Sequence, residues 1–375
     1  MKKILFGVFC SLLSFGCQQQ SLENKLSSSE ESIKIGWIGP LTGEASSYGE
    51  MLQKVVQQEI KRINTEGGVQ GRNLEIIWED GKCNAGEAAK AAQKLIKINK
   101  VHIILSHCSG ETLGIAPITE KEKVLVISPF SSSPEITHAG DFVFRTDPNA
   151  EMQSKISAEY ANENFPQIGL LYEQADYAVG VIDAFKKYYT SDIKTEEVFV
   201  PSESDFKTRV TKLKNSDIDG IFLVTQFPAK FDVIIKQMVE QNWEIPILTM
   251  EIATGNEDII QKYPDFLKDR MVASDFLAPN TDVFQEFTQE YKEKYGEAPA
   301  YPAYAATTVD AFRVLKKILS EASDMNDTQE LRDALYEIES FPSMFGTLSF
   351  DKNGDVNIGY ILLRFDGKKF VPLES

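Results

Sequence analysis

Short apolar runs rich in β-branched residues alternate along the chain with longer segments whose apolar residues recur every three or four positions. In the first third of the chain, these runs cover residues 33–38, 74–80, 101–105 and 124–127. The segment after the first run places on one helical face Leu52, Val55, Val56, Ile60 and Ile63. Strands that alternate with helices in this way predict βαβ units built on a parallel sheet.

The same alternation returns in the second half of the chain. Strand-like runs cover residues 167–172, 196–200, 220–225 and 245–248, and helix-like segments cover 177–189, 206–213 and 229–241. Three more helix-like segments follow at 283–295, 302–320 and 328–338. Two such blocks within 375 residues predict an α/β protein with two Rossmann-like lobes.

Two strand ends carry small polar residues, namely Cys108-Ser109-Gly110 and the Ser- and Pro-rich stretch 128–135. They read as the carboxyl ends of two parallel strands in one βαβ unit, which is where an open α/β sheet binds its ligand. The first end opens directly into a helix, whose unpaired N–H groups suit a carboxylate. The alternative is that serine and proline merely end the strands.

Several motifs resemble those of a known family. They are Tyr48-Gly49 before the first helix, the turn Asn64-x-x-Gly67-Gly68-Val69-x-Gly71, the cysteines at 83 and 108, and the stretch from Ser128 to Thr137. Together they resemble the branched-chain amino-acid-binding family of type I periplasmic binding proteins, over roughly residues 32–370. The resemblance implies two lobes joined by a hinge of three strands.

The resemblance also implies how the chain is divided. We expect the crossings between the lobes near Thr146–Asp147, Asp275–Leu277 and Asp351–Val356. The first lobe would then contain residues 32–147 and 277–350, and the second lobe residues 148–276 and 351–375.

The family holds the carboxylate of an amino acid at the first-lobe corner, which implies that role for Ser109 and Ser132. Ser132 stands where threonine is common and keeps the hydroxyl, while the carbonyl of Phe130 would accept from the ammonium group. From the second lobe, Glu251 stands at the strand end that matches the ammonium site. The alternative for this glutamate is a solvated loop residue.

Aromatic and amide side chains would form the walls of the site. Tyr48 and Tyr177 match family positions that contact the ligand, although tyrosines at such turns equally often pack helices. Gln226 stands where the closest family members carry tyrosine, and an amide there adds hydrogen-bonding capacity. We therefore expect an amino acid or amino-acid-like ligand, with only a weak preference for leucine, isoleucine or valine.

The N-terminus has the pattern of an export signal. Lys2-Lys3 precede an apolar stretch that ends at Gly16-Cys17, so residues 1–17 are expected to be a lipoprotein signal and Cys17 the lipid anchor. The position three residues before the cysteine is Ser14 rather than the usual leucine, which leaves secretion of a soluble form as the alternative. The polar segment 18–31 predicts a flexible tether.

Two cysteines remain after cleavage, Cys83 and Cys108. An even pair in an oxidising compartment favours a disulfide, and the resemblance implies this pairing. A bridge across about 25 residues stabilises a fold by roughly 3 kcal/mol in the chain-entropy description. A zinc site is the alternative, but it needs two more ligands, for which His102 and His107 are the near candidates.

Charge and motifs exclude several functions. The net charge of −17, which becomes −19 once Lys2 and Lys3 are removed, repels nucleic acid. No nucleophile elbow, zinc-protease, phosphate-loop or dinucleotide motif occurs in the sequence. The segment Asp351–Asp355 superficially resembles a calcium loop but lacks its spacing and favours a hairpin turn. We expect no enzyme, no cofactor and no metal.

The expected mechanism is closure of two lobes around a ligand that binds the closed state better. The expected partners are a membrane permease and its ATPase subunits, with the protein held in the periplasm or at the cell surface by its lipid anchor. The alternative is a ligand-sensing or regulatory module of the same fold that acts on a different partner.

Overall fold

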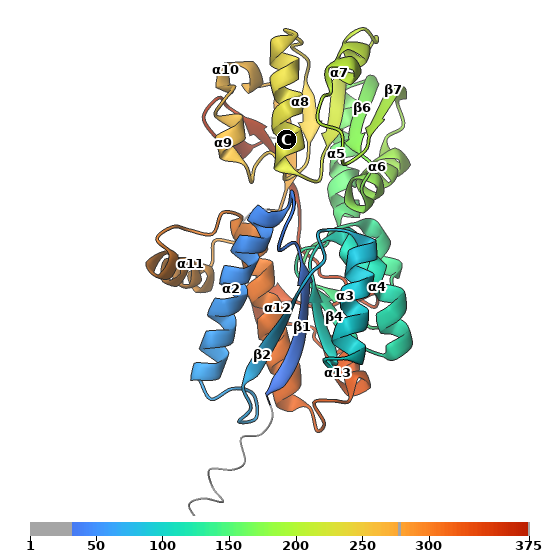
Figure 1. Ribbon diagram of the computed structural model, residues 1–375. Coiled ribbons are helices and arrows are strands. Elements are labelled where there is room, and N and C mark those ends of the chain that lie inside the picture. The colour runs from blue at the N-terminus through green and yellow to red at the C-terminus, as the bar shows by residue number, and fades with distance from the viewer. Residues whose placement is uncertain (1–31, 277–278, 374–375) are drawn as a thin grey trace, which may run out of the picture.

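The computed structural model describes residues 32–276 and 279–373. The expected signal 1–17 with Cys17, and the expected tether 18–31, lie outside this part of the chain. Two α/β lobes are stacked end to end and meet at a narrow waist (Figure 1). Within the described residues, no helix is long and apolar enough to cross a membrane.

The first lobe is built on a parallel five-stranded sheet with the order β2-β1-β3-β4-β5. Its strands are β1 (Ile33–Gly39), β2 (Leu74–Asp80), β3 (Ile103–Ser106), β4 (Leu125–Ser128) and β5 (Val143–Arg145). One face is covered by α2 (Ser46–Thr65), α11 (Asp282–Tyr295), α12 (Pro302–Glu321) and α13 (Thr328–Tyr336). The other face is covered by α3 (Ala85–Lys97), α4 (Ser109–Glu122) and the 3₁₀ turn η1 (Pro134–His138). A small hairpin, β11 (Phe341–Ser343) and β12 (Gly346–Leu348), completes this lobe.

The second lobe has a seven-stranded sheet with the order β14-β13-β10-β9-β8-β6-β7, in which only β13 and β14 run antiparallel to their neighbours. The strands are β6 (Gln167–Glu173), β7 (Asp192–Phe199), β8 (Gly220–Val224), β9 (Ile247–Thr249), β10 (Met271–Asp275), β13 (Ile361–Phe365) and β14 (Phe370–Pro372). One face is covered by α5 (Ala150–Asn164) and α6 (Asp176–Tyr188). The other is covered by α7 (Lys207–Lys214), α8 (Pro228–Glu240), α9 (Glu257–Ile260) and α10 (Pro264–Leu267).

The burial of the central strands explains why they appear in the sequence as continuous apolar runs. Every residue of β3, β4 and β8 is buried, because helices cover both faces of each sheet. Two separate cores sandwich the sheet in each lobe. The predicted α/β class with two Rossmann-like lobes is confirmed.

The third passage between the lobes differs slightly from the prediction. Phe350 and Val356 pair across a turn, and Val356 packs into the first lobe's core. Arg145 of β5 donates from its backbone to Gly354 at 3.0 Å and from Nε to Asp355 at 2.6 Å. These bonds hold the turn to the first lobe, so the chain leaves this lobe after Val356 rather than within 351–356.

Both sheets direct the carboxyl ends of their parallel strands toward the waist. In the first lobe, β1 and β3 are neighbours in the sheet, but the chain continues from β1 to β2 on one side of this pair and from β3 to β4 on the other. In the second lobe, the chain continues in the same way from β6 to β7 on one side and from β8 to β9 on the other. Such switch points are where doubly wound sheets form ligand crevices. The fold therefore sets two crevices against each other.

Candidate functional site

A cleft of about 820 Å³ lies between the two lobes. Its walls include the loops that follow β1 to β5 and the start of α12 in the first lobe, and the loops that follow β6, β8, β9 and β10 together with β13 and β14 in the second. The structure brings all seven predicted ligand contacts to this cleft, namely Tyr48, Ser109, Phe130, Ser132, Tyr177, Gln226 and Glu251.

The first-lobe corner presents hydroxyls at the start of a helix. Ser109 is the first residue of α4, and its Oγ accepts from the backbone N–H of Ser133 at 3.2 Å. Ser132 lines the cleft beside it, and both serines are largely buried. The neighbouring Ser131 is turned inward, where it hydrogen-bonds with Thr112 at 2.8 Å and with the His107 carbonyl. The corner thus has the donors that a carboxylate needs.

A disulfide between Cys83 and Cys108 fixes this corner, with the Cα atoms 5.0 Å apart. Buried Glu111 accepts from the backbone N–H groups of both cysteines, at 2.9 and 3.0 Å. Burial raises the pKa of Glu111 to about 7. These three residues are the only group with metal-ligand spacing in the described part of the chain, and the disulfide engages both sulfur atoms, against the zinc alternative.

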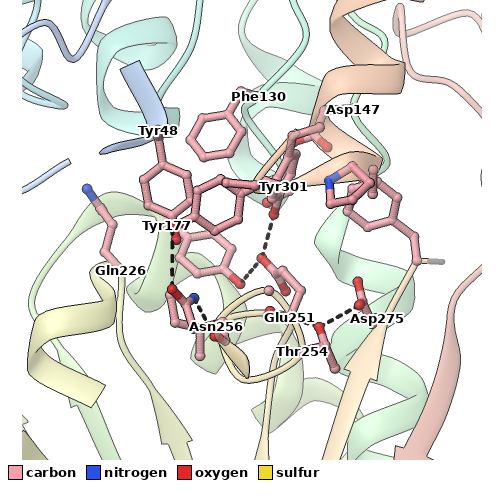
Figure 2. A pocket seen from close by; sticks show the side chains of 18 of the residues that line it. Tyr48, Phe130, Asp147, Tyr177, Gln226, Glu251, Thr254, Asn256, Asp275 and Tyr301 are labelled. Carbon is pink, nitrogen blue, oxygen red and sulfur yellow. Dashed lines mark hydrogen bonds between the residues drawn. The ribbon is translucent and has the colours of Figure 1, made fainter. Parts of the chain in front are cut away.

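Glu251 is held in place by donors from both lobes (Figure 2). Its Oε1 accepts from Tyr177 of the second lobe at 2.7 Å and from Tyr304 of the first lobe at 3.1 Å. Its Oε2 accepts from Gln153 Nε2 at 2.7 Å. A carboxylate has about four acceptor sites, so one remains for an incoming donor. This glutamate is therefore no solvated loop residue.

Aromatic rings form the first-lobe wall of the cleft. The ring of Tyr48 lies 4.3 Å from that of Tyr301 and 5.1 Å from that of Phe130, measured between centroids. Phe130 in turn meets Tyr304 edge-on at 4.4 Å. Figure 2 shows Gln226 on the side of the cleft near Tyr48, across from two aspartates.

Those two aspartates are cleft residues that sequence reasoning missed. Asp147 is 1% exposed, and its Oδ1 has no hydrogen-bond partner. Burial, with the nearby charge of Glu251, raises the pKa of Asp147 well above its usual value. Asp275 accepts from Thr254 Oγ1 at 2.5 Å, and burial raises its pKa to about 8. The available signal was that both stand at predicted crossings between the lobes.

Two α/β lobes whose strand ends face each other across a cleft lined by aromatic rings and carboxyl groups are the architecture of a two-lobed binding protein. The chain belongs to the Periplasmic binding protein family, which it matches over residues 32–369. The recognition made from the sequence motifs is thereby confirmed. Because this is a family of binding proteins, the chain is not an enzyme.

Curated relatives are similar in sequence over most of the chain. The Leu/Ile/Val-binding protein homolog 1 of Brucella abortus is 24% identical over 386 residues, covering 98% of this chain and 97% of its own. The leucine-, isoleucine-, valine-, threonine- and alanine-binding protein of Pseudomonas aeruginosa is 26% identical, with 87% of each chain covered.

Solved structures agree as well. The branched-chain amino acid transporter substrate binding protein LivJ of Streptococcus pneumoniae, in complex with isoleucine, has a TM-score of 0.79 at 25% identity, with 90% of this chain and 97% of its own covered. A Rhodopseudomonas palustris solute binding protein in complex with benzoate matches at a TM-score of 0.80 but only 17% identity, with 91% and 95% covered, and shows the fold alone.

Proposed function

We propose that the protein captures an amino acid or amino-acid-like molecule between its lobes and delivers it to an ABC permease with ATPase subunits. Relatives that bind branched-chain amino acids support a solute-binding role of this kind. The proposal rests above all on Glu251, whose remaining acceptor site lies across the cleft from the donors at the start of α4. A zwitterion fits this arrangement, with its ammonium group at Glu251 and its carboxylate at the start of α4.

An aromatic acid without an ammonium group fits this cleft poorly. Benzoate carries one negative charge, and the cleft already contains the carboxyl groups of Asp147, Glu251 and Asp275. An anion beside the Glu251 carboxylate is repelled, more strongly where water is excluded, and it brings no donor to the buried carboxyl groups of Asp147 and Asp275. The charges of the site therefore favour a ligand with a cationic group.

Closure of the hinge is the step that we assign to ligand capture. Glu251 already bonds to Tyr304 of the opposite lobe, so a ligand that also contacts Glu251 and the serine corner interacts more strongly with the closed state. A permease would bind this closed state.

A lipid anchor at Cys17 would hold the protein outside the cytoplasm. The position of the first strand supports this arrangement. Strand β1 begins at the end of the first lobe that is farthest from the second lobe (Figure 1). A tether attached there leaves the cleft free to face a permease.

The test is calorimetric titration of the chain from Gln18 onward, which contains every residue that the structure describes. The protein is unfolded and refolded to remove carried ligand, then titrated with all common amino acids, small amides and benzoates. We expect micromolar or tighter binding to an amino acid, and Glu251→Ala weakens it by about ten- to a hundredfold because a hydrogen bond to a charged group is lost. Binding of benzoates alone, or unchanged affinity in Glu251→Ala, contradicts the proposal.

A further inference from the structure

The cleft holds more carboxyl groups than a simple amino acid can pair. Asp147, Glu251 and Asp275, together with the exposed Asp258, line it, whereas Lys369 is the single cationic side chain among the described lining residues. Lys369 lies at the exposed turn before β14. The α-ammonium group of a bound amino acid pairs with Glu251, and its α-carboxylate adds a further negative charge at the serine corner. The carboxyl groups of Asp147 and Asp275, whose pKa values burial raises in the empty cleft, then remain without a cationic partner from the ligand.

Asp147 needs a partner more than Asp275 does. It is almost fully buried, and its Oδ1 makes no hydrogen bond. Arg145 attracts the Asp147 carboxyl group electrostatically but makes no hydrogen bond to its Oδ1, since Arg145 donates to Asp355 at 2.6 Å and to the Ser133 carbonyl at 2.8 Å. A buried carboxyl group with a free acceptor atom requires a partner, because leaving it unpaired is unfavourable.

The carboxyl oxygen atoms of the described cleft residues do not form a group with metal-ligand spacing. The described residues contain one group with metal-ligand spacing, and it is formed by Cys83, Cys108 and Glu111 rather than by the cleft carboxylates. Asp147 lies two residues after β5 and Asp275 ends β10, and Figure 2 shows Asp147 apart from Glu251 and Asp275. Charges spread in this way match an extended ligand with more than one positive group.

We infer that the ligand carries a second cationic group at the end of its side chain, as a diamino or guanidino acid does, and that Asp147 and Asp275 receive it. This inference rests on the proposed function. Aromatic rings beside the two aspartates suit a cation, because Phe276 follows Asp275 directly and lies 5.3 Å from Tyr304 and 5.8 Å from Tyr360 between centroids. Both aspartates lie on hinge segments, so neutralising them also favours the closed lobes.

Matched ligand pairs test the inference on the unmodified protein. The refolded chain is titrated with L-lysine against L-norleucine and with L-arginine against L-citrulline, which differ mainly in the side-chain charge. We expect the cationic member of at least one pair to bind tenfold tighter or more, at about 1.4 kcal/mol per tenfold. Equal or tighter binding of both neutral members overturns the inference while leaving the proposed function intact. Silence toward every amino acid overturns both.

Asp147→Asn locates the effect. We expect it to reduce the preference for the cationic member by about tenfold, whereas Asp192→Asn, an exposed carboxylate on edge strand β7, leaves the preference unchanged. Circular dichroism and a melting curve confirm that each variant is folded, and Asp275→Asn is the second variant if Asp147→Asn does not fold. An unchanged preference in a folded Asp147→Asn or Asp275→Asn protein overturns the assignment to these residues.

Discussion

Neighbouring serines after β4 differ in what they contact. Ser132 lines the cleft, whereas Ser131 is 1% exposed and bonds to Thr112 and the His107 carbonyl inside the first lobe. We expect Ser132→Ala to weaken ligand binding by about tenfold with little change in stability, because it removes one hydrogen bond to a charged ligand group. Titration and a denaturant curve measure the two effects.

Ser131→Ala is the matched control and should show the opposite pattern. It removes the donor to the buried His107 carbonyl and one of the hydrogen-bond partners of Thr112, so we expect a loss of about 1–3 kcal/mol in the free energy of unfolding and nearly unchanged affinity. If Ser131→Ala loses affinity and Ser132→Ala does not, the corner is oriented differently from this account.

Residues of the site could be predicted where each follows an apolar run, because parallel strands end at one edge of a sheet. That argument brings Ser109, Gln226 and Glu251 to one cleft. It does not identify Asp147 or Asp275, whose importance depends on burial and, for Asp147, on an oxygen atom without a hydrogen-bond partner. Those properties arise only when the two lobes meet.

At the scale of elements, α8 of the second lobe touches the loop between β1 and α2 of the first. Lys230 of α8 lies 3.1 Å from Glu44 of that loop, and Phe227, which caps α8, packs into the first lobe's core. We expect Glu44→Gln to weaken ligand binding about two- to fivefold, because the ion pair, in which Glu44 is half-exposed, contributes up to about 1 kcal/mol to the closed state.

Glu50→Gln is the matched control for this contact. Glu50 pairs with Lys54 on the same helix, at 3.0 Å, so it does not bridge the lobes. Titration at low and high salt separates the two variants, since the difference should shrink as salt screens the pair. An equal loss of affinity in both variants contradicts the contact's role in closure.

Element types could be read from the sequence because the period of the apolar positions differs between strands and helices. The passage after Val356 could not, because it depends on the ion pair between Arg145 and Asp355, which are distant in sequence. Periodicity carries no information on such pairings.

At the scale of the whole molecule, buried carboxyl groups set the pH dependence of stability. Burial raises the pKa of Asp275 to about 8 and the pKa values of Glu111 and Asp310 to about 7. The folded state therefore retains protons that the unfolded state has lost, and stability falls as pH rises through these values. Between pH 6.5 and 8.5 Asp275 alone contributes about 2 kcal/mol, so we expect the melting temperature to drop.

This window avoids most of the opposite effect of His107. Burial lowers the pKa of His107 to about 4, so its contribution changes mainly between pH 4 and 6.5, and only about 0.4 kcal/mol of it remains above pH 6.5. Melting curves of the ligand-free protein at the two pH values provide the measurement, and Asp275→Asn should reduce the slope. A higher melting temperature at pH 8.5 than at pH 6.5 contradicts these assignments.

The central claim is that a ligand is held between the two lobes by the serine corner and Glu251. A crystal structure of the protein with its tightest-binding amino acid tests this claim most directly. The account predicts the ligand's carboxylate at Ser109 and Ser132 and its ammonium group within hydrogen-bonding distance of Glu251, with the lobes closed. A ligand outside the cleft, or one whose carboxylate is turned away from the start of α4, would contradict it.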